Sequence, residues 1–481
     1  GTIGNAQALN MAVTGDLTAR ARLLNLVQHG DLAVERLTGV DSLSLQVLGN
    51  LRAASQLGEN LLGGQINLKV SGLTGASGQR LQLGTGLVSQ QINLDLGADA
   101  WLGGLQGAAS QPGVLHLGTV AVNGTLDLGQ VSEVQQRGAW QLGGLVADVS
   151  GDWLASAGSS MDADKGVLLN SGGEVRLGNV SVANGDLDIQ AARLSAGAPS
   201  TRWHASGLLR LSSLGDIGSQ LQPLELSARQ LQVNSVTGGL FLSLAAGIQS
   251  GTLDSAGQQW LRSLGNLRLD RVSSGGDIQL QGSGLLELTA LNAERDLDLS
   301  GEALSVGTLD SRNGNLTVNL SDALRVDTLN VAGFGKLSSA SAVLGEASFA
   351  GALEQVHSGA VQIDRLTRAG NWTLQADSAR IGSATVNGQV QHTLTGALNL
   401  GQLDATGGWN LKAGRSEITE ANLGGAVSMQ LHDTLQLGVL TAGQGWTLRG
   451  TSATVTTADI QGVIDQQLSG ALTQDSLTAG A

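Results

Sequence analysis

The sequence predicts an all-β protein whose chain winds into a parallel β-helix, with coils of about 19 residues. Three observations predict this fold. Apolar residues recur at a fixed period in the C-terminal part of the chain, apolar and polar residues alternate within short segments, and Gly, Asn, Asp and Ser separate these segments. A fixed period is typical of a solenoid, which grows by stacking one coil on the next.

Three tryptophans establish the period. Trp372, Trp409 and Trp446 are 37 residues apart (409 − 372 and 446 − 409). The period comprises two coils, because Val390 follows Trp372 by 18 residues and precedes Trp409 by 19. The 37-residue double coils are clearest at 335–481. We expect the residues that share the period to line the core: Trp372, Trp409, Trp446, Val390, Val427, Ile464, Leu394, Leu431 and Leu468.

Alternation within each coil predicts strands. In segments such as 297–299 and 398–400, leucines at every second position flank a polar residue. A period of two places one set of side chains inside and the other outside, as in a half-buried β-strand. The residues between these segments favour tight turns. We therefore expect roughly three short strands per coil, stacked at about 4.8 Å.

Composition narrows the classes of protein. The chain contains 71 glycines, three prolines and no cysteine, so disulfides and thiolate chemistry are excluded. The net charge of −14 disfavours nucleic acid as a partner, since no basic stripe offsets it. No apolar run approaches the roughly 18 residues of a membrane helix. Residues 1–4 lack the features of a signal peptide. We expect no transmembrane segment, and we interpret the sequence as the middle portion of a longer protein.

Regularity divides the predicted rod into two parts. Residues 1–265 should form degenerate β-helix coils with loop excursions, and residues 266–481 should form regular coils continuous with them. The segments expected to leave the coil are 99–114, 153–166, 196–206, 215–224 and 255–264, and they contain the three prolines, Pro112, Pro199 and Pro223. This position suits proline, which cannot donate to a sheet ladder.

The periodic tryptophans admit two interpretations. They could form an aromatic ladder that stacks on sugars, or they could fill the core. The second is favoured, because each tryptophan shares strand parity with the leucine two residues later, so both point inward. The neighbouring outward positions, such as Thr373, Asn410 and Thr447, are short and polar. They predict either a solvated surface or a flat hydrogen-bonding face for glycan or protein partners.

Sites for metal ions or catalysis are poorly supported. Asp162 and Asp164 resemble the start of a calcium loop, but no carboxylate follows until Glu174. The six histidines are scattered singly, and no nucleophile, phosphate-binding or zinc motif occurs. Polysaccharide-cleaving β-helices need clustered carboxylates, which do not recur on one stack here. We expect no metal site, no cofactor and no enzymatic activity.

The recurring phrases carry a family resemblance. They are seen at 314–318 (Gly-Asn-Leu-Thr-Val), 323–326 (Ala-Leu-Arg-Val) and 328–331 (Thr-Leu-Asn-Val). They resemble the filamentous-haemagglutinin-type repeats of large bacterial exoproteins secreted by the two-partner route. The resemblance covers most of the chain and is clearest from about 265 to 481. The N-P-N secretion domain of that family is absent, so no binding or catalytic residue is carried over.

The resemblance implies a right-handed β-helix stalk of a secreted or cell-surface adhesin on a Gram-negative bacterium. Export would use an outer-membrane β-barrel transporter as partner. The stalk would project a distal tip in cell–cell, biofilm or host attachment, with exopolysaccharide, a host receptor or a neighbouring cell surface as further partners. Two alternatives remain. The chain could be a carbohydrate- or receptor-binding module that uses loops near 99–114, 153–166 and 196–224, or the shaft of a contact-dependent toxin-delivery exoprotein.

Overall fold

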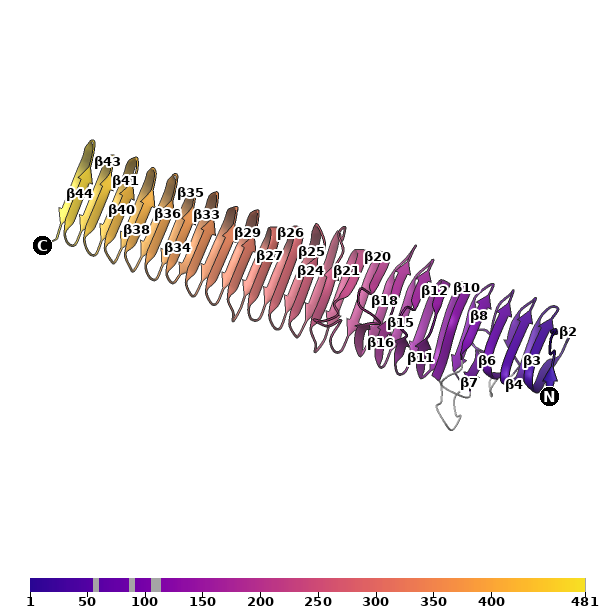
Figure 1. The fold of residues 1–481 in the computed structure, drawn as a ribbon. Helices are drawn as coiled ribbons and strands as arrows, with labels where there is room; N and C mark the ends of the chain where they lie inside the picture. Colours follow the sequence, from indigo (N-terminus) through magenta and orange to yellow (C-terminus); the bar gives the residue numbers. More distant parts are fainter. Residues whose placement is uncertain (55–59, 86–90, 105–113, 481) are drawn as a thin grey trace. The chain divides into compact units, whose positions relative to one another are not determined.

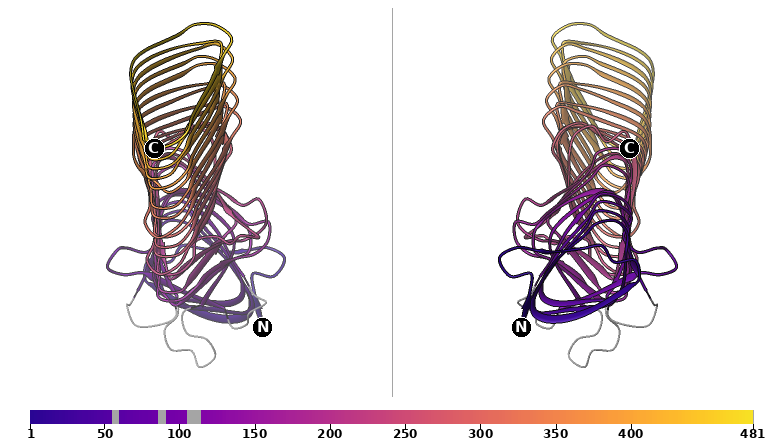
Figure 2. Two further views of the ribbon diagram at one scale, coloured as in Figure 1. Left: turned by 90° about the vertical axis from the view of Figure 1, so that its left-hand side faces the viewer. Right: turned by 90° about the vertical axis from the view of Figure 1, so that its right-hand side faces the viewer.

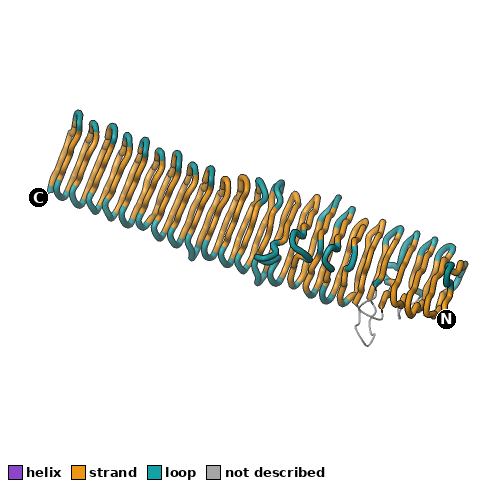
Figure 3. Tube along the Cα trace, in the orientation of Figure 1, coloured by secondary structure: helices purple, strands orange, loops and turns teal. Residues whose placement is uncertain are grey.

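The computed structural model describes residues 1–54, 60–85, 91–104 and 114–480. In this part of the chain there is no helix. Parallel strands stack as a β-solenoid of about 24 turns, with successive coils about 19 residues apart (Figure 1). The all-β parallel β-helix predicted from the repeat is therefore confirmed. Figure 3 shows strands joined by short turns along the chain.

The chain forms two compact units, Gly1–Ser255 and Ala256–Ala481. The strands of the first unit are β1 (Thr2–Ile3), β2 (Leu9–Met11), β3 (Asp16–Gln28), β4 (Leu32–Val47), β5 (Leu51–Ala53), β6 (Leu61–Val70), β7 (Leu81–Thr85), β8 (Ile92–Leu96), β9 (Ala100–Gly104), β10 (Val114–Val131), β11 (Glu133–Gln136), β12 (Ala139–Val149), β13 (Trp153–Ala155), β14 (Ser160–Ala163), β15 (Val167–Ser171), β16 (Glu174–Leu177), β17 (Asn179–Val182), β18 (Leu187–Ala191), β19 (Arg193–Ala196), β20 (Arg202–Ser213), β21 (Leu224–Ser235), β22 (Leu240–Leu244) and β23 (Ser250–Ser255).

The strands of the second unit are β24 (Gln259–Ser263), β25 (Leu267–Ser274), β26 (Ile278–Ala293), β27 (Leu297–Ser311), β28 (Leu316–Leu320), β29 (Ala323–Val331), β30 (Gly335–Ser339), β31 (Ser341–Phe349), β32 (Leu353–His357), β33 (Ala360–Ala369), β34 (Trp372–Ala376), β35 (Ser378–Val386), β36 (Val390–Leu394), β37 (Leu398–Ala405), β38 (Trp409–Ala413), β39 (Ser416–Leu423), β40 (Val427–Leu431), β41 (Thr434–Ala442), β42 (Trp446–Gly450), β43 (Ser452–Ile460), β44 (Ile464–Leu468) and β45 (Leu472–Ala479).

A regular coil of the second unit has three straight segments. The coil that begins at Trp372 consists of β34 and β35, and β35 turns a corner at Gly382 and Ser383, where two consecutive residues face away from the core. On either side of the corner, buried and unburied residues alternate, as the sequence predicts. Figure 2 shows the coils of this unit, coloured orange to yellow, one behind another.

The first strands of the second unit keep a continuous register, although other ladders of this unit contain shifts, for example between Leu366 and Ala369 of β33. The first strands of successive coils pair in parallel, so one inward position recurs in every coil. The residues in this column are Gln259, Ile278, Leu297, Leu316, Gly335, Leu353, Trp372, Val390, Trp409, Val427, Trp446 and Ile464. At about 4.8 Å per step, this column extends over roughly 50 Å. The periodic residues of the sequence are therefore stacked neighbours along one axis of this unit.

One gap in this column is filled from another strand. Gly335 has no side chain to contribute, and a Cβ atom there would lie 2.1 Å from Cε1 of Phe349. The ring of Phe349, which is fully buried, therefore occupies the space above Gly335. Core packing leaves few voids of this size, so glycine and phenylalanine compensate each other in volume.

The first unit has the same parallel stacking with less regular coils. Its ladders contain register shifts, for example between Ala205 and Leu208 of β20. Large side chains, among them Trp140, Trp153 and Trp203, are fully buried in its interior. The rings of Trp140 and Trp153 lie 5.4 Å apart, and the indole N–H of Trp140 donates to the Gly118 carbonyl. A buried tryptophan of this unit thus packs against another aromatic ring and also has a backbone oxygen as the acceptor of its indole N–H.

Two of the expected excursions remain in the coil. Strands β13 and β14 lie within 153–166 and pair with the coils on both sides. Strand β24 lies within 255–264 and pairs with β26. The prediction of excursions is wrong for these two segments, because the strands within them keep the two-residue alternation and bury Met161, Ala163 and Leu261.

The other three segments differ among themselves. Residues 105–113, including Pro112, lie outside the described residues. A short loop containing Pro199 precedes β20, and Pro223 immediately precedes β21. Between them, the backbones of Ser219 and Gln222 exchange two hydrogen bonds of 3.1 Å, so the chain forms a narrow hairpin there. The side chain at its tip, Leu221, is 95% exposed.

Candidate binding groove

The predicted core residues are placed by the stacking just described. Trp372, Trp409, Trp446, Val390, Val427, Leu394 and Leu431 are buried, whereas Ile464 and Leu468 are half-buried in the last complete first strand, β44. Large and small residues alternate, since Val390 pairs with both Trp372 and Trp409. The three tryptophans expose at most 1% of their surface. They present no ring face on which an external sugar could stack.

A histidine interrupts the leucines beside the tryptophans. His392 occupies the inward position that Leu374 and Leu411 occupy in the neighbouring coils. Its ring lies edge-on between Trp372 and Trp409, with centroid distances of 4.4 and 5.8 Å. Neither ring nitrogen has a hydrogen-bond partner among the described residues. Burial lowers the pKa of His392 to about 3, because the charged form loses its hydration.

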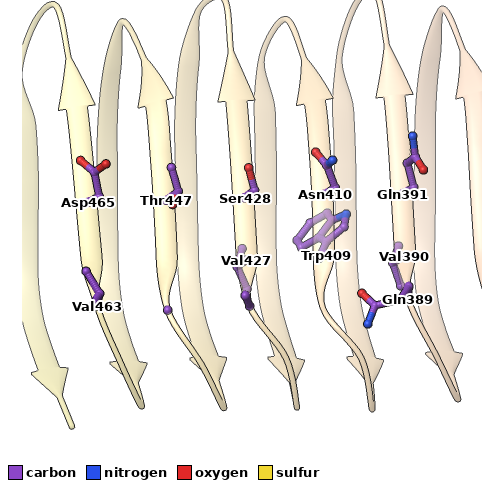
Figure 4. A pocket seen from close by; sticks show the side chains of 12 residues that line it. Gln389, Val390, Gln391, Trp409, Asn410, Val427, Ser428, Thr447, Val463 and Asp465 are labelled. Carbon is purple, nitrogen blue, oxygen red and sulfur yellow. The ribbon is translucent and has the colours of Figure 1, made fainter. Parts of the chain in front are cut away.

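A hollow on the surface of the second unit lies at the start of β36, β38, β40, β42 and β44. It is a groove with a volume of about 440 Å³. Its lining comes from five successive coils (Figure 4). The residues are Gln389, Val390, Gln391, Trp409, Asn410, Ala426, Val427, Ser428, Gly445, Thr447, Val463 and Asp465.

Small residues immediately before the strands create the groove. This position carries Gly408, Ala426 and Gly445 in three successive coils, between Gln389 and Val463. The backbone preserves the hollow. A Cβ atom at Gly408 would lie 2.4 Å from the Ala426 carbonyl oxygen, and one at Gly445 would lie 2.6 Å from that of Val463. Larger residues at the two glycines would therefore strain the turns.

In the two preceding coils, the same position bridges one coil to the next. The Oδ1 atom of Asn371 accepts the N–H of Gln389 at 2.9 Å, and the Oε1 atom of Gln389 accepts the N–H of Gly408 at 2.9 Å. The bridging stops at Gly408, which has no side chain. The N–H groups of Ala426, Gly445 and Val463 consequently donate to no protein oxygen in the described ranges. The groove contains a row of free backbone donors.

Polar side chains form one wall of the groove. Gln391, Asn410, Ser428, Thr447 and Asp465 pair in register and lie in a row on the outer face of the strands (Figure 4). The side chains of Gln391, Asn410, Ser428 and Thr447 make no hydrogen bond to another described residue. This row contains Asn410 and Thr447, two of the outward residues for which the sequence predicted a polar face.

Charge in the groove is confined to one end. Asp465 pairs with the guanidinium of Arg449, and the hydrogen bond from Arg449 lowers the pKa of the Asp465 carboxyl group. The other lining side chains are neutral amides, hydroxyls, aliphatic groups and one indole. The groove therefore offers hydrogen-bond donors and acceptors without a strong electrostatic potential.

The calcium-like residues lie elsewhere, on the outer surface of the first unit. Asp162 lies on β14, and Asp164 follows that strand and accepts a hydrogen bond from the side chain of Asn184 at 2.8 Å. Both carboxylates are exposed. Within the described residues, no three His, Cys, Asp or Glu side chains gather closely enough to hold a metal ion.

A second hollow lies in the first unit, next to β3. Its volume is about 350 Å³, and Gln28, Asp31 and Val13 are among its lining residues. Two of its polar side chains, those of Gln28 and Asp31, already have partners. The buried amide of Gln28 bonds to both backbone groups of Val13, and Asp31 accepts the N–H of Asn50, which lowers the pKa of its carboxyl group. These contacts hold neighbouring turns of the chain together.

The sequence predicts the polar outer face but not the groove. The residues that reveal the groove stand immediately before the strands, where Gly408, Ala426 and Gly445 replace longer residues such as Asn371 and Gln389. In the sequence, these small residues resemble ordinary turn formers. They form a groove only because successive coils place them directly above one another.

Comparison with known proteins adds no relative. No family model matches the chain, and neither a curated protein nor a solved structure is significantly similar to it. Over the described residues, no helix is long and apolar enough to span a membrane.

Proposed function

We propose that this chain is a stalk segment of a large bacterial adhesin, secreted or displayed at the cell surface. The observation that carries the proposal is the parallel β-solenoid itself, which fits an elongated adhesin-like stalk. Each added coil lengthens a solenoid by a fixed amount, so a long chain can separate a distal tip from its anchor. The haemagglutinin-like phrases at 314–331 support the same role.

The proposal extends to export. An outer-membrane β-barrel transporter would carry the chain across the Gram-negative outer membrane before it folds. Two properties support this route. The chain contains no cysteine, so it cannot form a disulfide in an oxidising compartment. Its coils pair with immediate neighbours, so folding can proceed coil by coil as the chain emerges.

Cell-surface labelling tests the proposal. An antibody raised against this chain should label intact cells of the source bacterium, and deletion of the gene should reduce attachment of the cells to one another or to a surface. Labelling that requires permeabilised cells would contradict the proposal, as would unchanged attachment by the deletion strain. Reduced killing of neighbouring cells, without reduced attachment, would instead favour the toxin-delivery shaft.

A second candidate function rests on the loops of the first unit. The hairpin at 219–222 exposes Leu221 almost completely, and such exposed apolar side chains can contact a partner. Beads coated with the purified chain would then bind host or bacterial cells directly. Loss of this binding in a Leu221→Ser variant would favour a receptor-binding module over a passive stalk.

A further inference from the structure

We propose that the groove of the second unit binds an uncharged, extended oligosaccharide that lies across successive coils. This binding site is independent of the stalk role, because it depends only on the lining of the groove. Three properties carry the inference: the dimensions of the groove, its row of unused hydrogen-bonding groups, and its near neutrality.

The dimensions suit an extended ligand. The volume of about 440 Å³ lies within the range of roughly 300–1,000 Å³ that is usual for ligand sites. The lining spans five coils, from Gln389 to Val463. Four steps of about 4.8 Å give a length of roughly 19 Å. A single sugar ring would occupy only part of this length, whereas a chain of several rings would cover it.

The hydrogen-bonding groups suit a ligand rich in hydroxyls. The free N–H groups of Ala426 and Gly445 are donors, and each needs an oxygen acceptor in place of the side chain that serves in earlier coils. The amides of Gln391 and Asn410 and the hydroxyl of Ser428 both donate and accept. A hydroxyl group does both as well, so successive rings of a saccharide can match successive coils.

The remaining lining favours the same class of ligand. The methyl group of Ala426 and the exposed side chain of Val463 offer apolar contact to the C–H faces of sugar rings. Trp409 also lines the groove, and its buried indole N–H has no hydrogen-bond partner among the described residues. Binding should therefore change the environment of one tryptophan, which provides a spectroscopic signal.

Other extended ligands fit less well. A peptide cannot join the sheet as an additional strand, because the backbones of β38, β40 and β42 already pair on both sides. A polyanion would approach a chain with a net charge of −14 and a groove whose one carboxylate, Asp465, is already paired with Arg449. Neutral saccharides avoid both obstacles.

Titration calorimetry of the full chain with four hexasaccharides tests the proposal. The neutral probes are cellohexaose, laminarihexaose and maltohexaose, and the charged probe is hexagalacturonate. We expect at least one neutral probe to bind and to shift tryptophan emission, with hexagalacturonate binding at least tenfold more weakly. Absence of binding by all three neutral probes would overturn the proposal, as would preferential binding of hexagalacturonate or of an extended peptide of matching length.

Two substitutions at Ala426 locate the site. Ala426→Leu fills the groove, and Ala426→Asn introduces an amide where Asn371 has one, so that the N–H of Gly445 gains a partner within the chain. Both should weaken binding at least tenfold. Ala352→Leu is the matched control, since Ala352 also precedes a first strand but lies outside the groove. Equal affinity of all three variants and the unmodified chain would contradict the location.

A substitution in the polar wall tests the chemistry. Asn410→Ala should weaken binding of the neutral probe about five- to tenfold, as expected for the loss of one hydrogen bond. Asn399→Ala removes an equivalent exposed amide from β37, outside the groove, and should leave the affinity unchanged. Circular dichroism of each variant separates a folding defect from a loss of binding. Equal effects of the two substitutions would argue against recognition by this wall.

Discussion

At the scale of single residues, the second unit contains buried polar groups in a column that is otherwise apolar. Gln355 and His392 occupy inward positions where neighbouring coils have Leu374 and Leu411. Gln355 is partly satisfied, since its Oε1 atom accepts the indole N–H of Trp372 at 2.9 Å. His392 has no partner among the described residues. Burial of this polar side chain without a hydrogen bond therefore lowers the free energy of unfolding, relative to an apolar side chain at the same position.

This cost predicts a stability that depends on pH. His392 has a pKa of about 3 when folded and about 6.5 when unfolded. Between these two pH values, His392 binds a proton in the unfolded chain but not in the folded one. The free energy of unfolding is therefore highest above pH 6.5 and declines as the pH falls toward 3. The loss should reach about 3 kcal/mol at pH 4. Because burial also lowers the pKa of His357 to about 4, the loss due to His392 is measured by urea denaturation at pH 7 and pH 4 as the difference between the unmodified chain and a variant without this histidine.

A substitution isolates the contribution of this side chain. His392→Leu should raise stability at pH 7 by about 1–3 kcal/mol and should remove most of the acid-dependent loss attributed to the histidine. His432→Leu is the control, because His432 is exposed and its ring contacts only the Ala413 carbonyl oxygen, which lies 3.4 Å from Nδ1. If the two variants showed the same decline as the unmodified chain, the histidine in the core would not be the cause.

At the scale of the elements, side chains before the strands connect coil to coil. Asp296 accepts the N–H of Asn315 at 2.8 Å, and Asn315 accepts the N–H of Phe334 at 3.0 Å. The first unit uses the same arrangement, in which Asp31 accepts the N–H of Asn50 and Asn50 accepts that of Leu73. These bonds explain why Asn or Asp precedes the first apolar residue in phrases such as Gly-Asn-Leu.

Removal of one such bridge should loosen one turn. Asn315→Ala leaves the N–H of Phe334 without its acceptor, so we expect a loss of about 1 kcal/mol in local stability. Hydrogen exchange at the Phe334 amide should accelerate several-fold, while amides in distant coils keep their rates. Asn330→Ala is the comparison, because Asn330 is exposed on β29 and faces away from the core. Equal acceleration at Phe334 in both variants would contradict the bridging role.

At the scale of the whole molecule, the sequence repeat predicts most of the fold. Residues one period apart occupy equivalent positions in stacked coils, so the period determines which residues are neighbours. The period of Trp372, Trp409 and Trp446 predicts the columns, and alternation predicts which residues face inward. Neither rule predicts the groove at Ala426, since a hollow depends on several coils at once. The alternation also corrects the expected excursion at 153–166, where Met161 and Ala163 are buried in a strand.

Modularity predicts that whole double coils are dispensable. Deletion of residues 372–408 removes one 37-residue period, and Trp409 can then pair with Leu353 as Trp372 does now. The shortened chain should fold with an unchanged β-sheet circular dichroism spectrum, and small-angle scattering should detect a decrease of about 10 Å in its maximum dimension. Deletion of 372–398 ends out of register and should fail to fold. Equal behaviour of the two deletions would contradict independent stacking of the coils.

The interchangeability of coils that begin with Trp372, Trp409 and Trp446 also has a genetic consequence. Gain or loss of the coding sequence for one such period would add or remove two complete coils, so the reading frame and the protein interior would both survive. Natural variants of this chain should therefore tolerate a change in the number of coils more readily than a change in the identity of the inward residues.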